Sequence, residues 1–228
     1  MHLHRLLPIA LALSALSAPA AAEVSWYAGA AGGQSRTDHE LVENRESTLL
    51  FATDIRTDFD DSDTAWKAFA GLRFNRVLAL ELSYADLGSH RMRTTLMGGE
   101  PPLPAAIIIN RKVTGYGLDL VGTMPLDIDR LDIFAKVGVF RSRIEADATL
   151  EGNIEFSGGA GERFRSTKRN EENLHLGLGV QYWFTPRFAV RAEYERFASL
   201  GKPFAVGGSG TTGQADTDVA WVGLVARF

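Results

Sequence analysis

The sequence predicts an all-β fold, namely an eight-stranded antiparallel up-and-down transmembrane β-barrel with short periplasmic turns and long extracellular loops. Apolar and polar residues alternate with a period of two through most of the chain, which is typical of strands with one apolar face. No internal stretch approaches the ~18 consecutive apolar residues of a transmembrane helix. Short and long connections alternate, with both chain ends on the short-turn side, and this layout is typical of an outer-membrane barrel.

Residues 1–22 have the pattern of a cleaved signal peptide. Arg5 supplies a positive charge, an apolar run follows it, and small residues at 20–22 fit the cleavage rule. The run is shorter than the ~20 residues that a membrane anchor needs. We expect cleavage before Glu23, so that residues 23–228 form one outer-membrane barrel domain.

Eight segments after Glu23 show the alternation, at residues 25–33, 65–74, 77–87, 113–122, 131–140, 173–184, 188–197 and 218–228. Short connections cover residues 75–76, 125–130 and 185–187. Long connections run roughly over residues 34–63, 90–110, 148–172 and 198–216. Because the strand number is even, both termini lie at the end with the short turns.

One face of these strands lacks ionised residues through its middle, whereas the opposite face carries five acids and five bases. The interior of an eight-stranded barrel is just wide enough for side chains to fill it, and unpaired buried charges are unfavourable. We therefore expect paired charges in the lumen; the predicted lumenal network is Lys67, Arg73, Glu81, Asp119, Lys136, Arg191 and Glu193. The other inward positions are Asp132, His175, Glu195 and Arg227. A narrow, gated ion path is the alternative to such a plug.

Aromatic residues indicate which face meets lipid, because alternation alone also fits a soluble barrel with the faces reversed. The predicted aromatic girdle comprises Trp66, Phe74, Tyr84, Tyr182, Phe184, Phe188, Tyr194 and Phe228. Five of them lie near the short turns, namely Phe74, Tyr182, Phe184, Phe188 and Phe228. Trp66, Tyr84 and Tyr194, together with Tyr116, lie towards the long loops. Two aromatic belts that bracket an apolar band match the two interfaces of a bilayer. The apolar face is therefore predicted to point outward.

The composition excludes several kinds of site. There is no cysteine, so neither a disulfide nor a Cys-ligated metal can form. The net charge of −4 shows no basic footprint for nucleic acid. A hydrolase would need a His beside a Ser or Asp near the outer rim. Ser89 and His90 are neighbours, but adjacent strand residues point to opposite faces. We expect no catalytic residue, no metal site and no cofactor.

The long connections offer three further features. The first holds an acidic run, Asp54, Asp58, Asp60, Asp61 and Asp63, whose spacing lacks the Gly and Glu of a calcium-binding loop. We expect a solvated acidic loop there, with divalent-ion bridging to lipopolysaccharide as a hypothesis. The second holds Ile107–Ile109, expected to continue a hairpin rather than form an exposed patch. The third and fourth long connections are polar and Gly-rich, as surface segments are.

The sequence resembles the small outer-membrane barrel family, that is, the OmpA-like transmembrane domain and its opacity-protein relatives. The resemblance rests on WYAGAAGG at residues 26–33, VRAEYERF at 190–197 and the alternating strand that ends in Phe228. It implies a place in the outer membrane of a Gram-negative cell, among outer-membrane lipids and lipopolysaccharide. It also implies that the terminal aromatic belongs to the signal read by the barrel-assembly machinery.

For function, this resemblance implies a non-catalytic role in envelope structure and in surface interaction, with a possible ligand held by the loops. A small diffusion channel is the main alternative, and a lipid-modifying enzyme is a third. Because the chain stops where the barrel stops, we expect no peptidoglycan-binding domain and no anchoring to the cell wall.

Overall fold

The computed structural model describes residues 24–39, 54–60, 62–97, 105–126, 130–152, 161–200, 204–206, 210–212 and 215–228. Nearly all of them lie in strands, and none of them forms a helix long and apolar enough to cross a membrane. The signal peptide predicted at 1–22 lies outside the described residues and stays a prediction.

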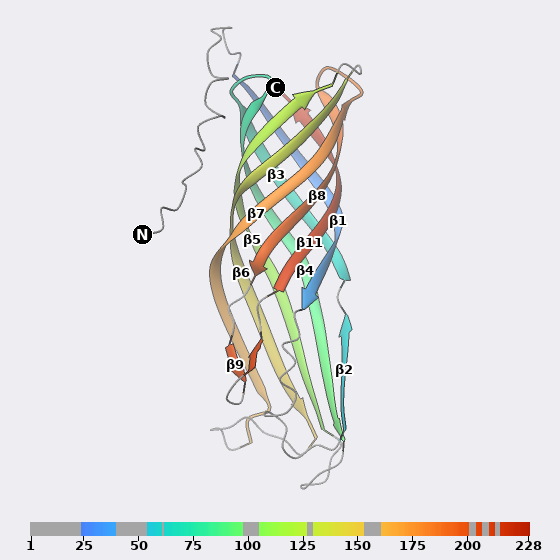
Figure 1. Ribbon diagram of the computed structural model, residues 1–228, viewed down its shortest axis with the longest axis vertical. Coiled ribbons are helices and arrows are strands. Elements are labelled where there is room, and N and C mark those ends of the chain that lie inside the picture. The colour runs from blue at the N-terminus through green and yellow to red at the C-terminus, as the bar shows by residue number, and fades with distance from the viewer. Residues whose placement is uncertain are drawn as a thin grey trace, which may run out of the picture.

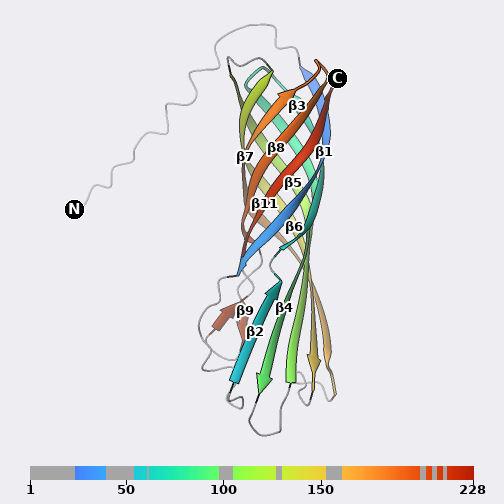
Figure 2. The same cartoon turned by 90° about the vertical axis from the view of Figure 1, so that its right-hand side faces the viewer.

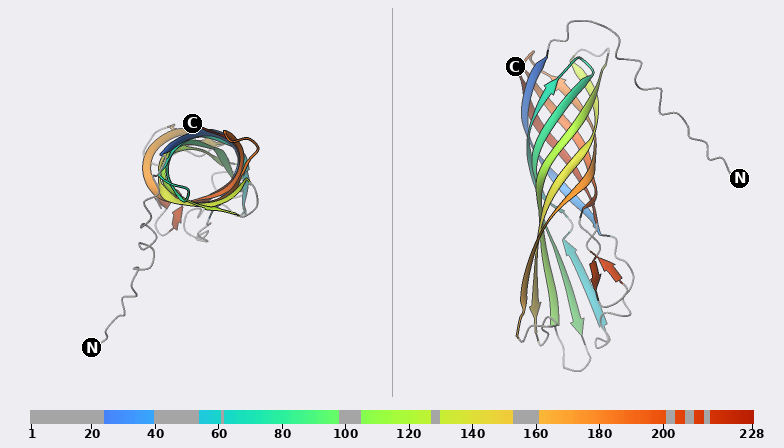
Figure 3. Two further views of the ribbon diagram at one scale, coloured as in Figure 1. Left: turned by 90° about the horizontal axis from the view of Figure 1, so that it is seen from above. Right: turned by 90° about the vertical axis from the view of Figure 1, so that its left-hand side faces the viewer.

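Eight strands close into a barrel, which forms a ring when it is viewed along its axis (Figures 1 and 3). They are β1 (Ser25–His39), β3 (Ser62–Arg73), β4 (Leu78–Met97), β5 (Ala105–Pro125), β6 (Leu131–Glu151), β7 (Phe164–Trp183), β8 (Phe188–Leu200) and β11 (Ala215–Arg227). Each is antiparallel to its neighbours, and β1 pairs with β11 in a register that aligns Tyr27 with Arg227. This closure satisfies the backbone inside a bilayer. The predicted eight-stranded antiparallel barrel is confirmed.

Local side-chain chemistry explains two of the tight turns, which lie at the same end as the C-terminus (Figure 1). Asn75 Oδ1 accepts hydrogen bonds from the backbone N–H groups of Val77 and Leu78, both at 2.8 Å. Thr185 Oγ1 accepts one from the N–H of Phe188 at 2.9 Å. Asn and Thr favour turns because their side chains replace the backbone partner in this way. Both turns lie where the alternation predicted them.

Four strands continue well beyond the barrel rim at the opposite end (Figure 2). β4, β5, β6 and β7 contain 20, 21, 21 and 20 residues, whereas β8 and β11 contain 13 each. Residues Ile107–Ile109 lie within β5 and pair with both β4 and β6, so the predicted hairpin extension is confirmed. The short strands β9 (Phe204–Val206) and β10 (Gly210–Thr212) pair with each other nearby.

The first long connection differs from the predicted acidic loop. Its residues 54–60 form the strand β2 (Asp54–Asp60), which pairs antiparallel with the outer part of β4. Ile55, Thr57 and Phe59 alternate with charged residues there, but the acidic run hid this pattern in the sequence. The extension is thus an open sheet in the order β2-β4-β5-β6-β7.

The outer wall carries a broad apolar band. Its exposed large apolar side chains include Leu80, Leu82, Leu118, Leu120, Val137, Val139, Leu174, Leu176, Leu178, Val190, Val222 and Leu224. Monomeric soluble proteins rarely expose an apolar surface of this extent to water. The band therefore faces lipid, and the inward positions form the core.

Candidate functional site

A layer of ionised side chains crosses the middle of the lumen. Alternate residues of a strand point inward, and the ionised side chains of this layer occupy such inward-facing positions. The members are buried and come from six strands: Lys67, Glu81, Asp119, Lys136, His175, Arg191, Glu193 and Glu195. We call these eight residues the charged layer.

Two lysines and two glutamates form the centre of the charged layer. Lys67 Nζ lies 2.7 Å from Glu195 Oε1 and 2.8 Å from Glu193 Oε1. Lys136 Nζ lies 2.5 Å from Glu193 Oε1 and also pairs with Glu195. The contacts to Glu193 are ion pairs whose angles fall outside hydrogen-bond geometry. Each glutamate therefore meets both ammonium groups, and removal of either cation leaves the acids only partly compensated.

A second group is built around Arg191. Its guanidinium donates to Glu81 Oε2 at 2.7 Å, and Tyr27 donates its hydroxyl proton to the same oxygen at 2.9 Å. The guanidinium lies over the rings of Phe134 and Phe69, with centroid distances of 4.0 and 4.8 Å. These contacts combine charge-assisted hydrogen bonds with cation–π attraction, so Arg191 is held from several strands at once.

His175 lies between two carboxylates at the edge of the charged layer. Its Nδ1 is 2.8 Å from Asp119 Oδ1, and its Nε2 is 3.5 Å from Glu195 Oε2. The imidazole stacks on Phe197, with centroids 4.4 Å apart, and Trp221 donates its indole N–H to Glu195 Oε2 at 2.6 Å. Three cations and four carboxylates make up the rest of the layer, so one proton bound within the layer renders it neutral.

Apolar side chains close the lumen on both sides of the charged layer. On the side of the extended sheet lie Ala65, Ala85, Leu87, Val113, Phe140, Ile144, Phe197, Leu200, Val219 and Trp221. On the side of the tight turns lie Tyr27, Phe69, Ala79, Val121, Phe134, Trp183, Ala189 and Val225. We call the charged layer with these two apolar layers the plug. It fills the interior as expected for an eight-stranded barrel.

The structure brings six of the seven predicted network residues into the charged layer and leaves one outside it. Arg73 faces inward nearer the tight-turn end, next to the second apolar layer, and lines a pocket there. The prediction omitted Glu195, which contacts both lysines, although the alternation placed it on the inward face. It also omitted Tyr27 and Trp221, whose polar atoms complete the shell of the carboxylates.

The predicted girdle residues all lie on the outer wall. At the rim near the extended sheet, Trp66, Tyr84 and Tyr116 form a row of rings with centroids 5.5 and 5.0 Å apart; Tyr194 is exposed on the same outer face. At the other end the predicted residues Phe74, Tyr182, Phe184, Phe188 and Phe228 are exposed, and so is Trp26, which the prediction omitted. Phe228 is 80% exposed, and its backbone N–H donates to Trp26 O at 2.9 Å.

The candidate catalytic pair does not assemble. Ser89 is exposed and His90 is buried, and the Ser89 hydroxyl and N–H both donate to Asp63 Oδ2, at 3.1 and 2.6 Å. The Ser89 N–H lowers the pKa of Asp63 below its ordinary value of 3.8. Within the described ranges, no three His, Asp or Glu side chains are grouped as metal ligands would be.

A closed antiparallel barrel with a lipid-facing apolar band, aromatic belts at both ends and a filled lumen defines a small membrane-spanning β-barrel protein. The chain belongs to the outer membrane protein β-barrel domain family, which residues 9–228 match. The protein is thus an outer-membrane protein, and the OmpA-like resemblance is confirmed.

The chain is 25% identical over 205 residues to outer membrane protein P5 of Haemophilus influenzae, covering 84% of this chain and 50% of that protein. It therefore spans half the length of that relative. The crystal structure of neisserial surface protein A aligns with a TM-score of 0.51 and 14% identity, over 89% of this chain and 97% of that one. Ail of Yersinia pestis aligns with a TM-score of 0.48 and 15% identity, over 90% and 99%.

Proposed function

We propose that the protein is a non-catalytic contact element of the cell surface, anchored by its plugged barrel and acting through the sheet that extends beyond the rim. A strand needs about 10 residues to cross a bilayer. β5 and β6 contain 21 residues each, so about half of each strand lies beyond the membrane. This extended sheet is the observation that carries the proposal.

The edge of β7 is the part of the extended sheet best suited to contact. Pairing between β7 and β8 begins at His175, whereas pairing between β7 and β6 continues to Phe164. In the portion of the chain that the structure describes, the outer edge of β7 before His175 therefore has no strand beside it. An open edge is a template for an added strand from another molecule.

The charge of this edge favours an acidic partner. Arg165, Lys168 and Arg169 are exposed on β7. Lys168 forms a solvent-exposed ion pair with Glu145 at 3.1 Å, and Arg165 forms one with Glu162 at 3.0 Å. Exposed pairs of this kind contribute little and exchange readily for a new partner. An extended, acidic segment is the ligand class that the edge fits.

Contact with lipopolysaccharide is supported by basic side chains just beyond the aromatic belt at the rim near the extended sheet. Arg141 is exposed and is aligned with Tyr116 in the sheet, and Arg143 and Lys112 lie further out. Cationic side chains at this level attract anionic headgroups. Recognition of Phe228 by the barrel-assembly machinery is likewise part of the proposal and rests on the family resemblance.

The two alternatives have less support. The plug argues against a diffusion channel, because apolar side chains lie on both sides of the charged layer. The opposite exposure of Ser89 and His90 argues against a hydrolase, since a nucleophile and its base must meet.

The proposal is tested by placing the barrel in lipid nanodiscs and measuring its binding to immobilised poly-L-glutamate by surface plasmon resonance. The variant K168E/R169E reverses two charges on the β7 edge and is expected to lose most of the binding. The variant R76E/R187E reverses two exposed arginines in the tight turns and is expected to bind like the wild type. Absence of wild-type binding, or equal loss in both variants, would contradict the proposal.

A further inference from the structure

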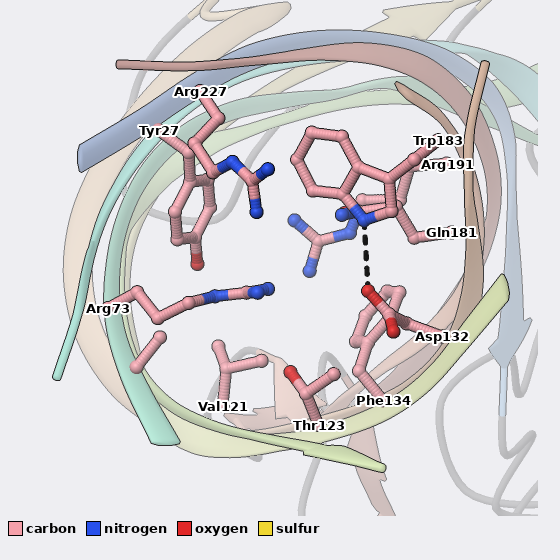
Figure 4. A pocket seen from close by; sticks show the side chains of 11 residues that line it. Tyr27, Arg73, Val121, Thr123, Asp132, Phe134, Gln181, Trp183, Arg191 and Arg227 are labelled. Carbon is pink, nitrogen blue, oxygen red and sulfur yellow. Dashed lines mark hydrogen bonds between the residues drawn. The ribbon is translucent and has the colours of Figure 1, made fainter. Parts of the chain in front are cut away.

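The lumen contains a pocket on the tight-turn side of the charged layer, within the second apolar layer and towards the periplasmic end of the barrel (Figure 4). Three guanidinium groups project into it from three different strands: Arg73 from β3, Arg191 from β8 and Arg227 from β11. We call this pocket the arginine vestibule. Neither the lipid-facing wall nor the extended sheet accounts for such a concentration of cationic side chains.

Negative charge in the wall of the vestibule is limited. Among the described residues that line it, Asp132 is the one acid, and its Oδ2 already accepts the indole N–H of Trp183 at 2.9 Å (Figure 4). Arg191 is committed to Glu81 and Glu193 in the charged layer. The two remaining cations, Arg73 and Arg227, are therefore balanced by a single carboxylate among the described lining residues, that of Asp132.

The two remaining arginines differ in how they are held. Arg227 donates to Pro186 O at 2.7 Å and lies 4.6 Å over the Trp183 ring, so its position is set by neutral partners. For Arg73, no hydrogen bond or ion pair occurs with any residue that the structure describes. Asp132 attracts this half-buried guanidinium only at longer range, so its hydrogen-bond donors stay available for a ligand.

We propose that the arginine vestibule binds a phosphate group, held between Arg73 and Arg227. A guanidinium presents paired N–H donors that match two oxygens of a phosphate. Thr123 and Gln181 line the same pocket and supply neutral polar groups beside the arginines. Partial exclusion of water strengthens these contacts relative to a free surface. The charged layer and the apolar layer beyond it close the inner end of the vestibule, so the site is filled from the periplasm and does not translocate its ligand.

The phosphate group has two sources, a free anion in the periplasm and the headgroup of an inner-leaflet phospholipid. The test uses the refolded barrel in a phosphate-free maltoside detergent and follows the Trp183 indole N–H by NMR during titration with inorganic phosphate. Sodium chloride at equal ionic strength serves as the ionic control. A saturable shift with phosphate, absent with chloride, is expected.

Two matched variants identify the residue that carries the site. R73Q is expected to weaken phosphate binding at least about tenfold, the loss typical of one charge-assisted partner. R76Q removes an exposed arginine in the adjacent turn and is expected to keep wild-type affinity. Retention of the heat-dependent gel shift shows that each variant is folded. No saturable shift in the wild type, or equal affinity in R73Q, would overturn the proposal.

Nanodiscs distinguish the two sources. If the headgroup is the ligand, the indole N–H of the wild type in phosphatidylglycerol nanodiscs is already shifted relative to that of R73Q, and added phosphate changes it no further. If the free anion is the ligand, the shift appears only when phosphate is added. Both outcomes support the vestibule as a phosphate site, provided that R73Q abolishes the shift.

Discussion

Lys67 on β3 and Glu195 on β8 place their charged atoms 2.7 Å apart, with both side chains almost completely excluded from solvent. The two strands are not neighbours in the barrel wall, because β3 pairs with β1 and β4 and β8 pairs with β7 and β11. The ion pair therefore crosses the lumen and links two strands that are three positions apart in the barrel wall.

Replacing Lys67 with methionine is expected to destabilise the barrel by about 3–5 kcal/mol, the range for a buried ion pair that loses one partner. Of the two lysines that contact both Glu193 and Glu195, Lys136 alone would then remain. The measurement is the urea midpoint of unfolding in lipid vesicles, followed by tryptophan fluorescence. The double variant K67M/E195Q should recover part of the loss, since it removes both partners; an unchanged midpoint in K67M would contradict the pairing.

Gly71 makes room for an inward aromatic ring. It is aligned with Tyr27 in the β1–β3 ladder, and a Cβ at this position would overlap the Tyr27 ring. We expect G71V to lower the unfolding free energy by about 1–3 kcal/mol, as overpacking does. Gly32 provides the control, because a Cβ there meets no atom within 4 Å. G32A should unfold at the wild-type urea concentration, and an equal effect of both changes would refute the role of Gly71.

The orientation of the wall predicts the effect of a charge on its outer face. Leu82 lies in the part of β4 that belongs to the barrel wall and is exposed on the apolar band. L82R is expected to destabilise the barrel by about 2–4 kcal/mol, the range for arginine near the bilayer midplane. Asn170 is exposed on the part of β7 beyond the rim, so N170R should be neutral. Equal stability of the two variants would mean that the apolar face does not meet lipid.

The contact between Asp63 and Ser89 predicts a pH dependence at the extracellular rim. The Ser89 N–H holds the pKa of Asp63 below the ordinary 3.8. A depressed folded pKa means that the stabilisation is complete above 3.8 and is lost as the pH falls through the folded value. The Ser89 amide proton shift should therefore titrate with a midpoint below 3.8, and D63N should remove this titration. A midpoint at or above 3.8 would contradict the contact.

The strand number, the closure and the orientation of the faces could be predicted from the sequence, because inside the bilayer every second residue must be apolar. The lengths of the strands could not. The alternation predicted a strand at 113–122, whereas β5 spans Ala105–Pro125. Beyond the membrane neither face of a strand meets lipid, so the regular pattern stops while the backbone pairing continues. β2 was predicted as a loop for a different reason, namely that its acidic residues hid an alternation that is present.

The charged layer could be predicted as a set of inward residues but not as a set of pairs. Which charges meet across the lumen depends on the stagger of the strands, and one sequence does not reveal the stagger. Arg73 and Lys67 lie on the same face of β3, yet only Lys67 reaches the charged layer. Glu195 could have been included from its position alone, since it follows Glu193 by two residues.

The central claim is that the barrel is closed by its plug and that the protein acts from its surface. It is tested most directly by reconstituting the folded barrel in planar bilayers and recording the ionic current. We expect no stable stepwise conductance from the wild type. Stable conductance steps in the wild type that change in size with E193Q would contradict the claim, because they would place an open ion path through the charged layer.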